Sequence, residues 1–232
     1  QIRIAPDVIS CNAAISASRR SPRWESALEL LSSIPQRRVA PDVLSCSAAI
    51  SSCEGGDNWR WAIALFGSMP RARIAPNVVS CNAAINACSG GRRWQLALAL
   101  FGLFPRLRIA PDVISFGAGI SACEDWEPAL RLLASMPQMR TAPNVVTCNA
   151  AIHACERGAE WRSALALLSS IPQLQMAPDR ISCAAATSAC ETGDRWQLSL
   201  ALSSSAALSS AATPTALQDG LPPAVSPRVP WL

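Results

Sequence analysis

The segment Pro76-Asn77-Val78-Val79-Ser80-Cys81-Asn82-Ala83-Ala84-Ile85-Asn86-Ala87-Cys88 decides the fold, because close copies of it recur along the chain. The Ala-Pro dipeptide that opens each copy begins at Ala5, Ala40, Ala75, Ala110, Ala142 and Ala177, so every step is 35 residues except one of 32. Tryptophan keeps the same spacing, at Trp24, Trp59, Trp94, Trp126, Trp161 and Trp196. A fixed period of this length is typical of solenoid repeat proteins.

The repeats divide the chain into an array and two flanking pieces. Residues 1–7 are expected to end a preceding repeat, and residues 203–232, rich in Ser, Ala and Pro, are expected to form a disordered tail. The array covers residues 8–202, with complete units 8–42, 43–77, 78–112, 113–144 and 145–179 and a partial unit 180–202. The fourth unit is short because Trp126 follows Cys123 by three positions, whereas Trp94 follows Cys88 by six.

Each repeat is predicted to form two helices. An Asp or Asn follows Pro and precedes an apolar run, which is the signature of a helix N-cap. Glycines such as Gly90 and Gly158 break the chain before the second helix, and a proline such as Pro105 should stop or kink that helix. Neither helix can bury its apolar stripe alone, so the sequence predicts an all-α solenoid of stacked antiparallel helical hairpins.

Composition excludes several classes of protein. Half of the residues are hydrophobic and 16% are charged, so most of the chain can bury a core. The net charge of +4 allows a polyanionic partner without requiring one. No apolar run reaches the roughly 18 residues of a membrane-spanning helix, so no membrane contact is expected.

Cysteine and histidine usage argues against a metal site or an enzyme. The ten cysteines occupy only the fourth and eleventh places of the repeats, and paired cysteines are seven residues apart, about 10 Å along a helix, which is too far for a disulfide. They are expected to be buried thiols in a reducing compartment. With a single histidine, His153, and no Cys-x-x-Cys, phosphate-loop or deaminase motif, we expect no metal, no cofactor and no catalysis.

The repeat resembles the 35-residue P-type unit of the pentatricopeptide repeat family. The segment quoted above is similar to that family's first helix, and Leu98-Ala99-Leu100-Phe101 is similar to its second. The resemblance spans residues 1 to about 202 and implies a right-handed α-solenoid of about five to six repeats. The fourth place, commonly Tyr in the family, holds cysteine here apart from Phe116. The 34-residue tetratricopeptide repeat fits less well, because the chain has no Tyr and a different period.

The resemblance implies a modular code in which one RNA base is read by each repeat. In the family, the fifth and last residues of a repeat contact the base edge. Asn with Asp tends to select uracil and Ser with Asn tends to select adenine, whereas Gly117 in repeat four should read weakly and Ala184 in repeat six should read nothing. The implied base-edge residues are Asn12 with Asp42, Ser47 with Asn77, Asn82 with Asp112, Gly117 with Asn144, and Asn149 with Asp179.

Two further sets of residues complete the expected RNA surface. The second residue of a repeat packs against the base face in the family, which here implies Ile9, Leu44, Val79, Ile114 and Val146. Arginine recurs four residues before the last residue of repeats one to four, and Gln175 breaks the series in repeat five. The phosphate-contacting set is then Arg38, Arg73, Arg108 and Arg140. Simpler readings stay open: Asp and Asn are good helix caps without RNA, Asn12 can be a solvent-facing polar residue, and the arginines can be solvated loop cations.

The expected function is sequence-selective binding of single-stranded RNA, with a ligand containing 5′-U-A-U-x-U-3′. The resemblance implies a monomer acting in organellar RNA processing, stability, editing or translation, in a mitochondrion or a plastid. One alternative is a scaffold that binds proteins, which should show an exposed apolar groove without polar reading residues. Another is a decayed family member that binds nothing strongly, with which Gly117, Ala184 and the short fourth repeat are consistent.

Overall fold

The computed structural model describes residues 8–18, 24–36 and 40–193, and these residues form helices without any strand. The chain forms two compact units, residues 1–122 and residues 123–232. The boundary falls in the short fourth repeat, directly before Cys123. None of the described helices is long and apolar enough to cross a membrane.

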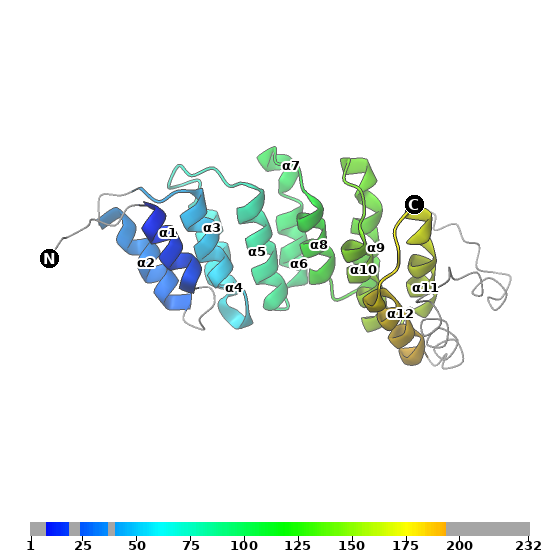
Figure 1. Cartoon of the computed structure of the whole chain (residues 1–232). Coiled ribbons are helices and arrows are strands. Elements are labelled where there is room, and N and C mark those ends of the chain that lie inside the picture. Colours follow the sequence, from blue (N-terminus) through cyan, green and yellow to red (C-terminus); the bar gives the residue numbers. More distant parts are fainter. Residues whose placement is uncertain (1–7, 19–23, 37–39, 194–232) are drawn as a thin grey trace, which may run out of the picture. The chain divides into compact units, whose positions relative to one another are not determined.

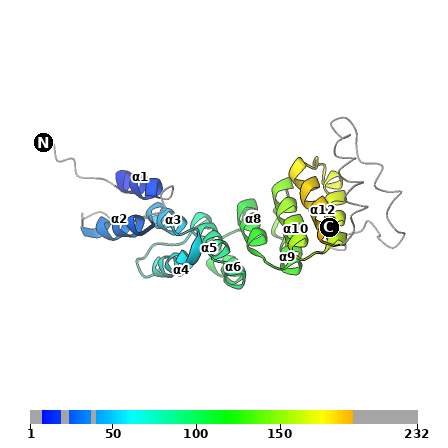
Figure 2. The same cartoon turned by 90° about the horizontal axis from the view of Figure 1, so that it is seen from below.

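The first unit is a stack of helical hairpins (Figure 1). In each hairpin the first helix packs on the second, and successive first helices also pack on each other, in the order α1, α3, α5, α8. Figure 2 shows these first helices in one layer and α2, α4 and α6 in another. The elements are α1 (Val8–Ser18), α2 (Trp24–Gln36), α3 (Val43–Ser52), the 3-10 turn η1 (Gly56–Asn58), α4 (Trp59–Ser68), α5 (Val78–Gly90), α6 (Trp94–Phe101), α7 (Phe104–Leu107) and α8 (Val113–Ala122).

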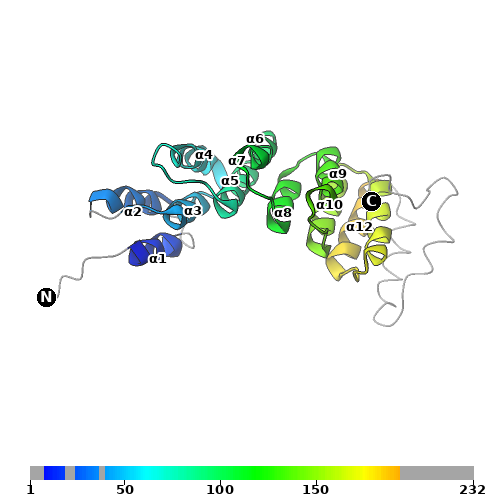
Figure 3. The ribbon, with the colours of Figure 1, turned by 90° about the horizontal axis from the view of Figure 1, so that it is seen from above.

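The second unit repeats the same packing (Figure 3). Helix α10 lies at its centre and contacts α9, α11 and α12, and α11 also packs on α12. The expected all-helical architecture of stacked hairpins is therefore confirmed within both units. The elements are α9 (Trp126–Ser135), the 3-10 turn η2 (Pro137–Met139), α10 (Val145–Arg157), α11 (Trp161–Ser170), the 3-10 turn η3 (Pro172–Leu174) and α12 (Arg180–Thr192).

The first helix of a repeat begins with an Asp or Asn N-cap, as the sequence predicts, and the structure adds that the cap is a reciprocal capping box. At α3, the backbone N–H of Ser45 donates to Oδ1 of Asp42 (2.7 Å), and the backbone N–H of Asp42 donates to Oγ of Ser45 (3.3 Å). The same reciprocal pair of bonds begins α5, α10 and α12. Each box satisfies backbone donors that the first turn of a helix would leave unpaired.

The second helix ends as the prolines predict in most repeats. Helices α4, α9 and α11 stop before Pro70, Pro137 and Pro172, which open one further turn, whereas α2 continues to Gln36, one residue beyond Pro35. That last turn closes on a residue in the left-handed backbone conformation, a position that usually favours glycine. Here the residues with positive φ are Arg73, Arg108, Arg140 and Gln175.

The core of each unit comes from the inner faces of the hairpins. One isoleucine per repeat is fully buried in the first helix, namely Ile15, Ile50, Ile85, Ile120 and Ile152. All ten cysteines are free thiols, and all are buried except Cys183, which is half-buried. Burial raises the pKa of Cys81, Cys88 and Cys148 to about 11, so these thiols stay protonated at neutral pH. The prediction of buried small thiols is confirmed for the cysteines.

Two glycines are needed for contact between successive repeats. Gly158, at the end of α10, lies against the indole ring of Trp126 in α9, and Gly193 lies in the same way against Trp161 in α11. A Cβ on Gly193 would lie 2.5 Å from Cδ1 of Trp161, far inside van der Waals contact. Neither glycine has positive φ, so the requirement here is space for the tryptophan and not backbone conformation.

Candidate nucleic-acid interface

The structure brings together the fifth and last residues of repeats one, three and five. Nδ2 of Asn12 donates to both carboxylate oxygens of Asp42, at 3.2 and 3.3 Å. Nδ2 of Asn149 donates to Asp179 in the same way, at 3.0 and 3.2 Å. In repeat three, Nδ2 of Asn82 donates to Oδ1 of Asp112 at 3.3 Å.

These asparagines are not simply solvent-facing polar residues. Asn82 and Asn149 are only 8% and 7% exposed, and Asn12 is half-buried. The amide of each is held by a carboxylate that also caps the next helix. Capping and pairing therefore coexist at the same Asp, because a carboxylate has about four lone-pair sites.

The three aspartates stay ionised at neutral pH. For Asp42 and Asp112, partial burial raises the pKa, but the hydrogen bonds from the capped serine and from the paired asparagine lower it further, so the net shift is downward. For Asp179, the backbone hydrogen bond from Ser182 leads the lowering of the pKa, with Asn149 contributing. Each pair thus combines an amide with a carboxylate that can only accept hydrogen bonds.

Repeats two and four lack such a pair. Oγ of Ser47 donates to the backbone carbonyl of Val43 (2.7 Å), and among the described residues no side-chain hydrogen bond joins Ser47 to Asn77. The Asn77 side chain accepts from the backbone N–H of Ser80 (2.9 Å). In repeat four, Gly117 and Asn144 fall in different units, and Asn144 caps α10.

The second residue of each repeat is an exposed aliphatic side chain. Ile9, Leu44, Val79, Ile114 and Val146 are between 50% and 77% exposed, although one isoleucine in each of these helices is fully buried. Ile181 in the partial sixth repeat is 57% exposed and continues the series. An exposed aliphatic residue at a fixed place in every repeat gains nothing from folding of the repeat itself, so it indicates a surface that meets a partner.

The arginine series lies at the connections between repeats. Arg73, Arg108 and Arg140 are exposed, and none forms an ion pair with a described residue. Arg38 lies outside the described residues. Each of these three exposed arginines lies four residues before the last residue of its repeat, which is Asn77, Asp112 or Asn144.

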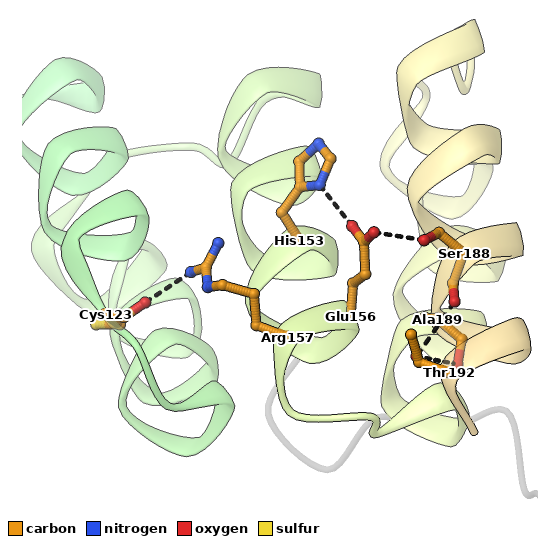
Figure 4. Close-up of polar contacts among 7 residues, drawn as sticks. All are labelled: Cys123, His153, Glu156, Arg157, Ser188, Ala189 and Thr192. Atoms are coloured by element: carbon orange, nitrogen blue, oxygen red, sulfur yellow. Dashed lines mark hydrogen bonds and ion pairs between the residues drawn. The ribbon is translucent and has the colours of Figure 1, made fainter.

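The single histidine belongs to a separate polar network in the second unit (Figure 4). Nδ1 of His153 lies 2.9 Å from Oε2 of Glu156, and Oγ of Ser188 on α12 donates to the other oxygen of Glu156 (2.5 Å). Burial raises the pKa of Glu156, but these hydrogen bonds outweigh it and lower the pKa. Nη2 of Arg157 donates to the carbonyl of Cys123 (2.6 Å). No cluster of potential metal ligands occurs within the described ranges.

One set of site residues escaped the sequence reasoning. Oγ of Ser45 donates to Oδ1 of Asn12 (2.6 Å), and Oγ of Ser182 donates to Oδ1 of Asn149 (2.5 Å), so a hydroxyl from the following repeat contacts the fifth residue. The signal was present in the sequence, because a Ser or Thr occurs at the third place of every repeat.

A family model for the pentatricopeptide repeat domain matches residues 64–126, which run from α4 to the start of α9. The residues that keep register there, from the capping Asn77 to Trp94, recur in the other repeats. Residues 64–126 therefore carry the repeat of the pentatricopeptide repeat family, and the same pattern continues on both sides of them.

Solved pentatricopeptide repeat structures share the fold of this helical array. The pentatricopeptide repeat protein PPR10 from maize is 23% identical, with a TM-score of 0.73 over 88% of this chain and 30% of the maize chain. PPR10 in complex with an 18-nt psaJ RNA element gives a TM-score of 0.63 at 23% identity, over 89% of this chain and 29% of that one. This chain therefore spans about 30% of the length of PPR10.

The array is also similar to a second solved structure, and it covers nearly the whole length of that structure. The PPR domain of Arabidopsis thaliana protein-only RNase P 1, in complex with tRNA, gives a TM-score of 0.61 at 13% identity, over 79% of this chain and 94% of that domain. Comparison with curated proteins found no match.

Proposed function

We propose that this chain is a pentatricopeptide repeat protein that binds single-stranded RNA and reads about one base with each repeat. The observation that carries the proposal is the coincidence, in repeats one, three and five, of an exposed aliphatic side chain with an amide–carboxylate pair. Ile9 accompanies Asn12 and Asp42, for example, and Val146 accompanies Asn149 and Asp179. An apolar contact for a base face beside polar groups for its edge is what recognition of an unstacked base requires.

The chemistry of the pairs favours uracil. The Watson–Crick edge of uracil has an N3–H donor between two carbonyl acceptors, so an ionised carboxylate can accept from N3–H while the amide donates to a carbonyl. Cytosine and adenine have an unprotonated ring nitrogen at the corresponding place, and a carboxylate would repel it. In repeat two, the neutral Asn77 can donate as well as accept, which suits adenine.

The proposed ligand contains 5′-U-A-U-x-U-3′, with the N-terminal repeat at the 5′ end as in the family. Repeats one to three lie in the first unit and would read U-A-U, and repeat five lies in the second unit and would read the final U. Repeat four would read weakly, because Gly117 has no side chain that forms hydrogen bonds. Arg38, Arg73, Arg108 and Arg140 are proposed to contact phosphates, so binding should weaken as salt concentration rises.

Two solved relatives support the proposal, since PPR10 and the PPR domain of protein-only RNase P 1 were each solved in complex with RNA. We propose that this chain acts on an organellar transcript by tethering or blocking, as a monomer and without catalysis of its own. The aliphatic row alone would also suit a protein ligand. The Asn–Asp pairs beside it favour RNA, because an apolar peptide would leave the repeated amides and carboxylates without hydrogen-bond partners.

Binding selection from a random single-stranded RNA pool, read by sequencing, tests the proposal. Enrichment of U-A-U-x-U is the expected result, and the control is a variant with Asn12, Asn82 and Asn149 all changed to Ala. Equal recovery of all RNA sequences by the natural chain would contradict sequence-selective RNA binding. The protein-scaffold and decayed-repeat alternatives would then remain.

A further inference from the structure

The amide–carboxylate pairs of repeats one and five include a third side chain. Ser45 follows Asp42 by three residues and belongs to the next repeat, yet its Oγ lies 2.6 Å from Oδ1 of Asn12. Ser182 makes the equivalent contact with Asn149 at 2.5 Å. Both serines have no exposed surface. The same hydroxyls also lie 2.8 and 2.9 Å from Oδ1 of Asp42 and Asp179.

The serine hydroxyl has one proton and two possible acceptors. The carboxylate Oδ1 of Asp42 already accepts from the backbone N–H of Ser45 (2.7 Å) and from Nδ2 of Asn12 (3.2 Å). Oδ1 of Asn12 has no other hydrogen-bond partner among the described residues, and its contact with the hydroxyl is the shorter one. A buried amide oxygen without a partner is costly, so the proton belongs on the side of Asn12.

We propose that Ser45 and Ser182 are specificity-determining residues that make their asparagines donor-only. The hydroxyl donates to Oδ1 of the asparagine, and the aspartate accepts a hydrogen bond from one of the two amide hydrogens. Only the second amide hydrogen is then left to donate to a base. The base must then offer an acceptor to the asparagine and a donor to the aspartate. Uracil does so through a carbonyl and N3–H, whereas cytosine has its N4 amino donor and its N3 acceptor in the opposite places.

Repeat three shows the same parts in a different arrangement. Oγ of Ser115 donates to Oδ1 of Asp112 (2.8 Å), and Oδ1 of Asn82 is buried with no partner in the described part of the chain. Asn82 thus keeps an acceptor that Asn12 and Asn149 have already used. Base three should therefore discriminate less strongly between uracil and cytosine than bases one and five.

The inference rests on the proposed RNA reading and is tested by Ser45→Ala and Ser182→Ala. The measurement is the ratio of affinities for RNAs with uracil or cytosine at base one or base five. Each variant frees the amide oxygen to accept from cytosine N4. The uracil preference at the corresponding base should therefore fall about fivefold, the effect of one net hydrogen bond of about 1 kcal/mol.

The chain offers a matched control, because the same serine also caps a helix. Ser80 makes the same capping box with Asn77, but its Oγ donates to the Asn77 backbone carbonyl (2.8 Å), and no hydrogen bond joins it to a fifth residue in the described part of the chain. Ser80→Ala should lower the melting temperature through loss of the cap and leave the preference at bases one and five unchanged. Ser45→Thr should keep the preference, since Thr147 caps α10 at the equivalent place.

A second measurement needs no RNA. The side-chain amide hydrogens of Asn149, assigned in NMR spectra by their absence from Asn149→Ser, should exchange faster with solvent in Ser182→Ala than in the natural chain. Unchanged exchange, or loss of affinity for uracil and cytosine in equal proportion, would overturn the inference and leave RNA reading intact. A natural chain with no preference for uracil at bases one and five would overturn both.

Discussion

Asn149 and Asp179 are separated by 30 residues in sequence and joined by a hydrogen bond of 3.0 Å between Nδ2 and Oδ1. Asn149 lies in α10, and Asp179 caps α12, the first helix of the next repeat. The proposed reading pair is therefore also part of the contact between two repeats. Changes at such pairs should therefore alter base preference and stability together.

Replacing the reading pair of repeat three with the pair of repeat two should change the base that repeat three prefers. The double variant Asn82→Ser with Asp112→Asn recreates the Ser47 and Asn77 combination of repeat two, in which a neutral amide replaces the carboxylate. We expect preference at base three to move from uracil to adenine by about fivefold or more, because an unpaired buried polar group costs about 1–3 kcal/mol. Competition binding with RNAs varied at base three measures it, with base one as the internal control. An unmoved preference at base three would contradict reading by separate repeats.

Repeat four should gain a base preference from one substitution. A Cβ at Gly117 would meet nothing within 4 Å, so a side chain fits without rearrangement. Gly117→Ser would supply a hydroxyl at the fifth place with Asn144 as last residue, and we expect adenine to become preferred at base four. Gly117→Ala is the matched control, because it adds the Cβ without a hydrogen-bonding group. Equal binding to all four bases by the serine variant would count against the proposed pairing.

Glycine-to-alanine changes should have opposite effects at two sites. Gly117→Ala should stabilise α8 by up to about 1 kcal/mol, because alanine favours helix more than glycine does and the site is open. Gly158→Ala places a Cβ against the ring of Trp126 and should destabilise by about 1–3 kcal/mol. Thermal or urea unfolding measures both. If Gly158→Ala also stabilised the protein, the close approach of Trp126 would not matter to packing.

Acid should remove the stabilisation that the charged caps provide. Asp42, Asp112 and Asp179 have folded-state pKa values below their usual 3.8, so their contribution is complete above that pH and is lost as pH falls through the folded value. We expect stability and uracil preference to be insensitive to these groups between about pH 8 and pH 5.

A neutral cap provides the control for this titration. Asp42→Asn copies the caps that Asn77 and Asn144 already form in this chain, and an asparagine does not titrate. The melting temperature of Asp42→Asn should therefore fall less steeply than that of the natural chain below pH 4. Equal slopes for the two proteins would show that the Asp42 carboxylate contributes nothing to this acid sensitivity.

Much of the architecture could be predicted from residue spacing. The 35-residue period, the N-cap residues and the glycine breaks located the helices, and N-caps begin α3, α5, α10 and α12 as expected. The buried cysteines followed from their place on the inner face of the first helix. The uneven effect of the prolines did not follow from the sequence, since α2 continues past Pro35 while α4 stops before Pro70.

The sequence alone determined the repeat, its two helices and the residue types at each reading place, because local propensities and periodicity act along the chain. Only the tertiary structure decided which of those residues meet. The contacts of Asn12 with Asp42 and Ser45 cross from one repeat to the next. The partner of a side-chain amide depends on distances of a few tenths of an ångström between packed helices, and spacing in the sequence cannot fix distances that small.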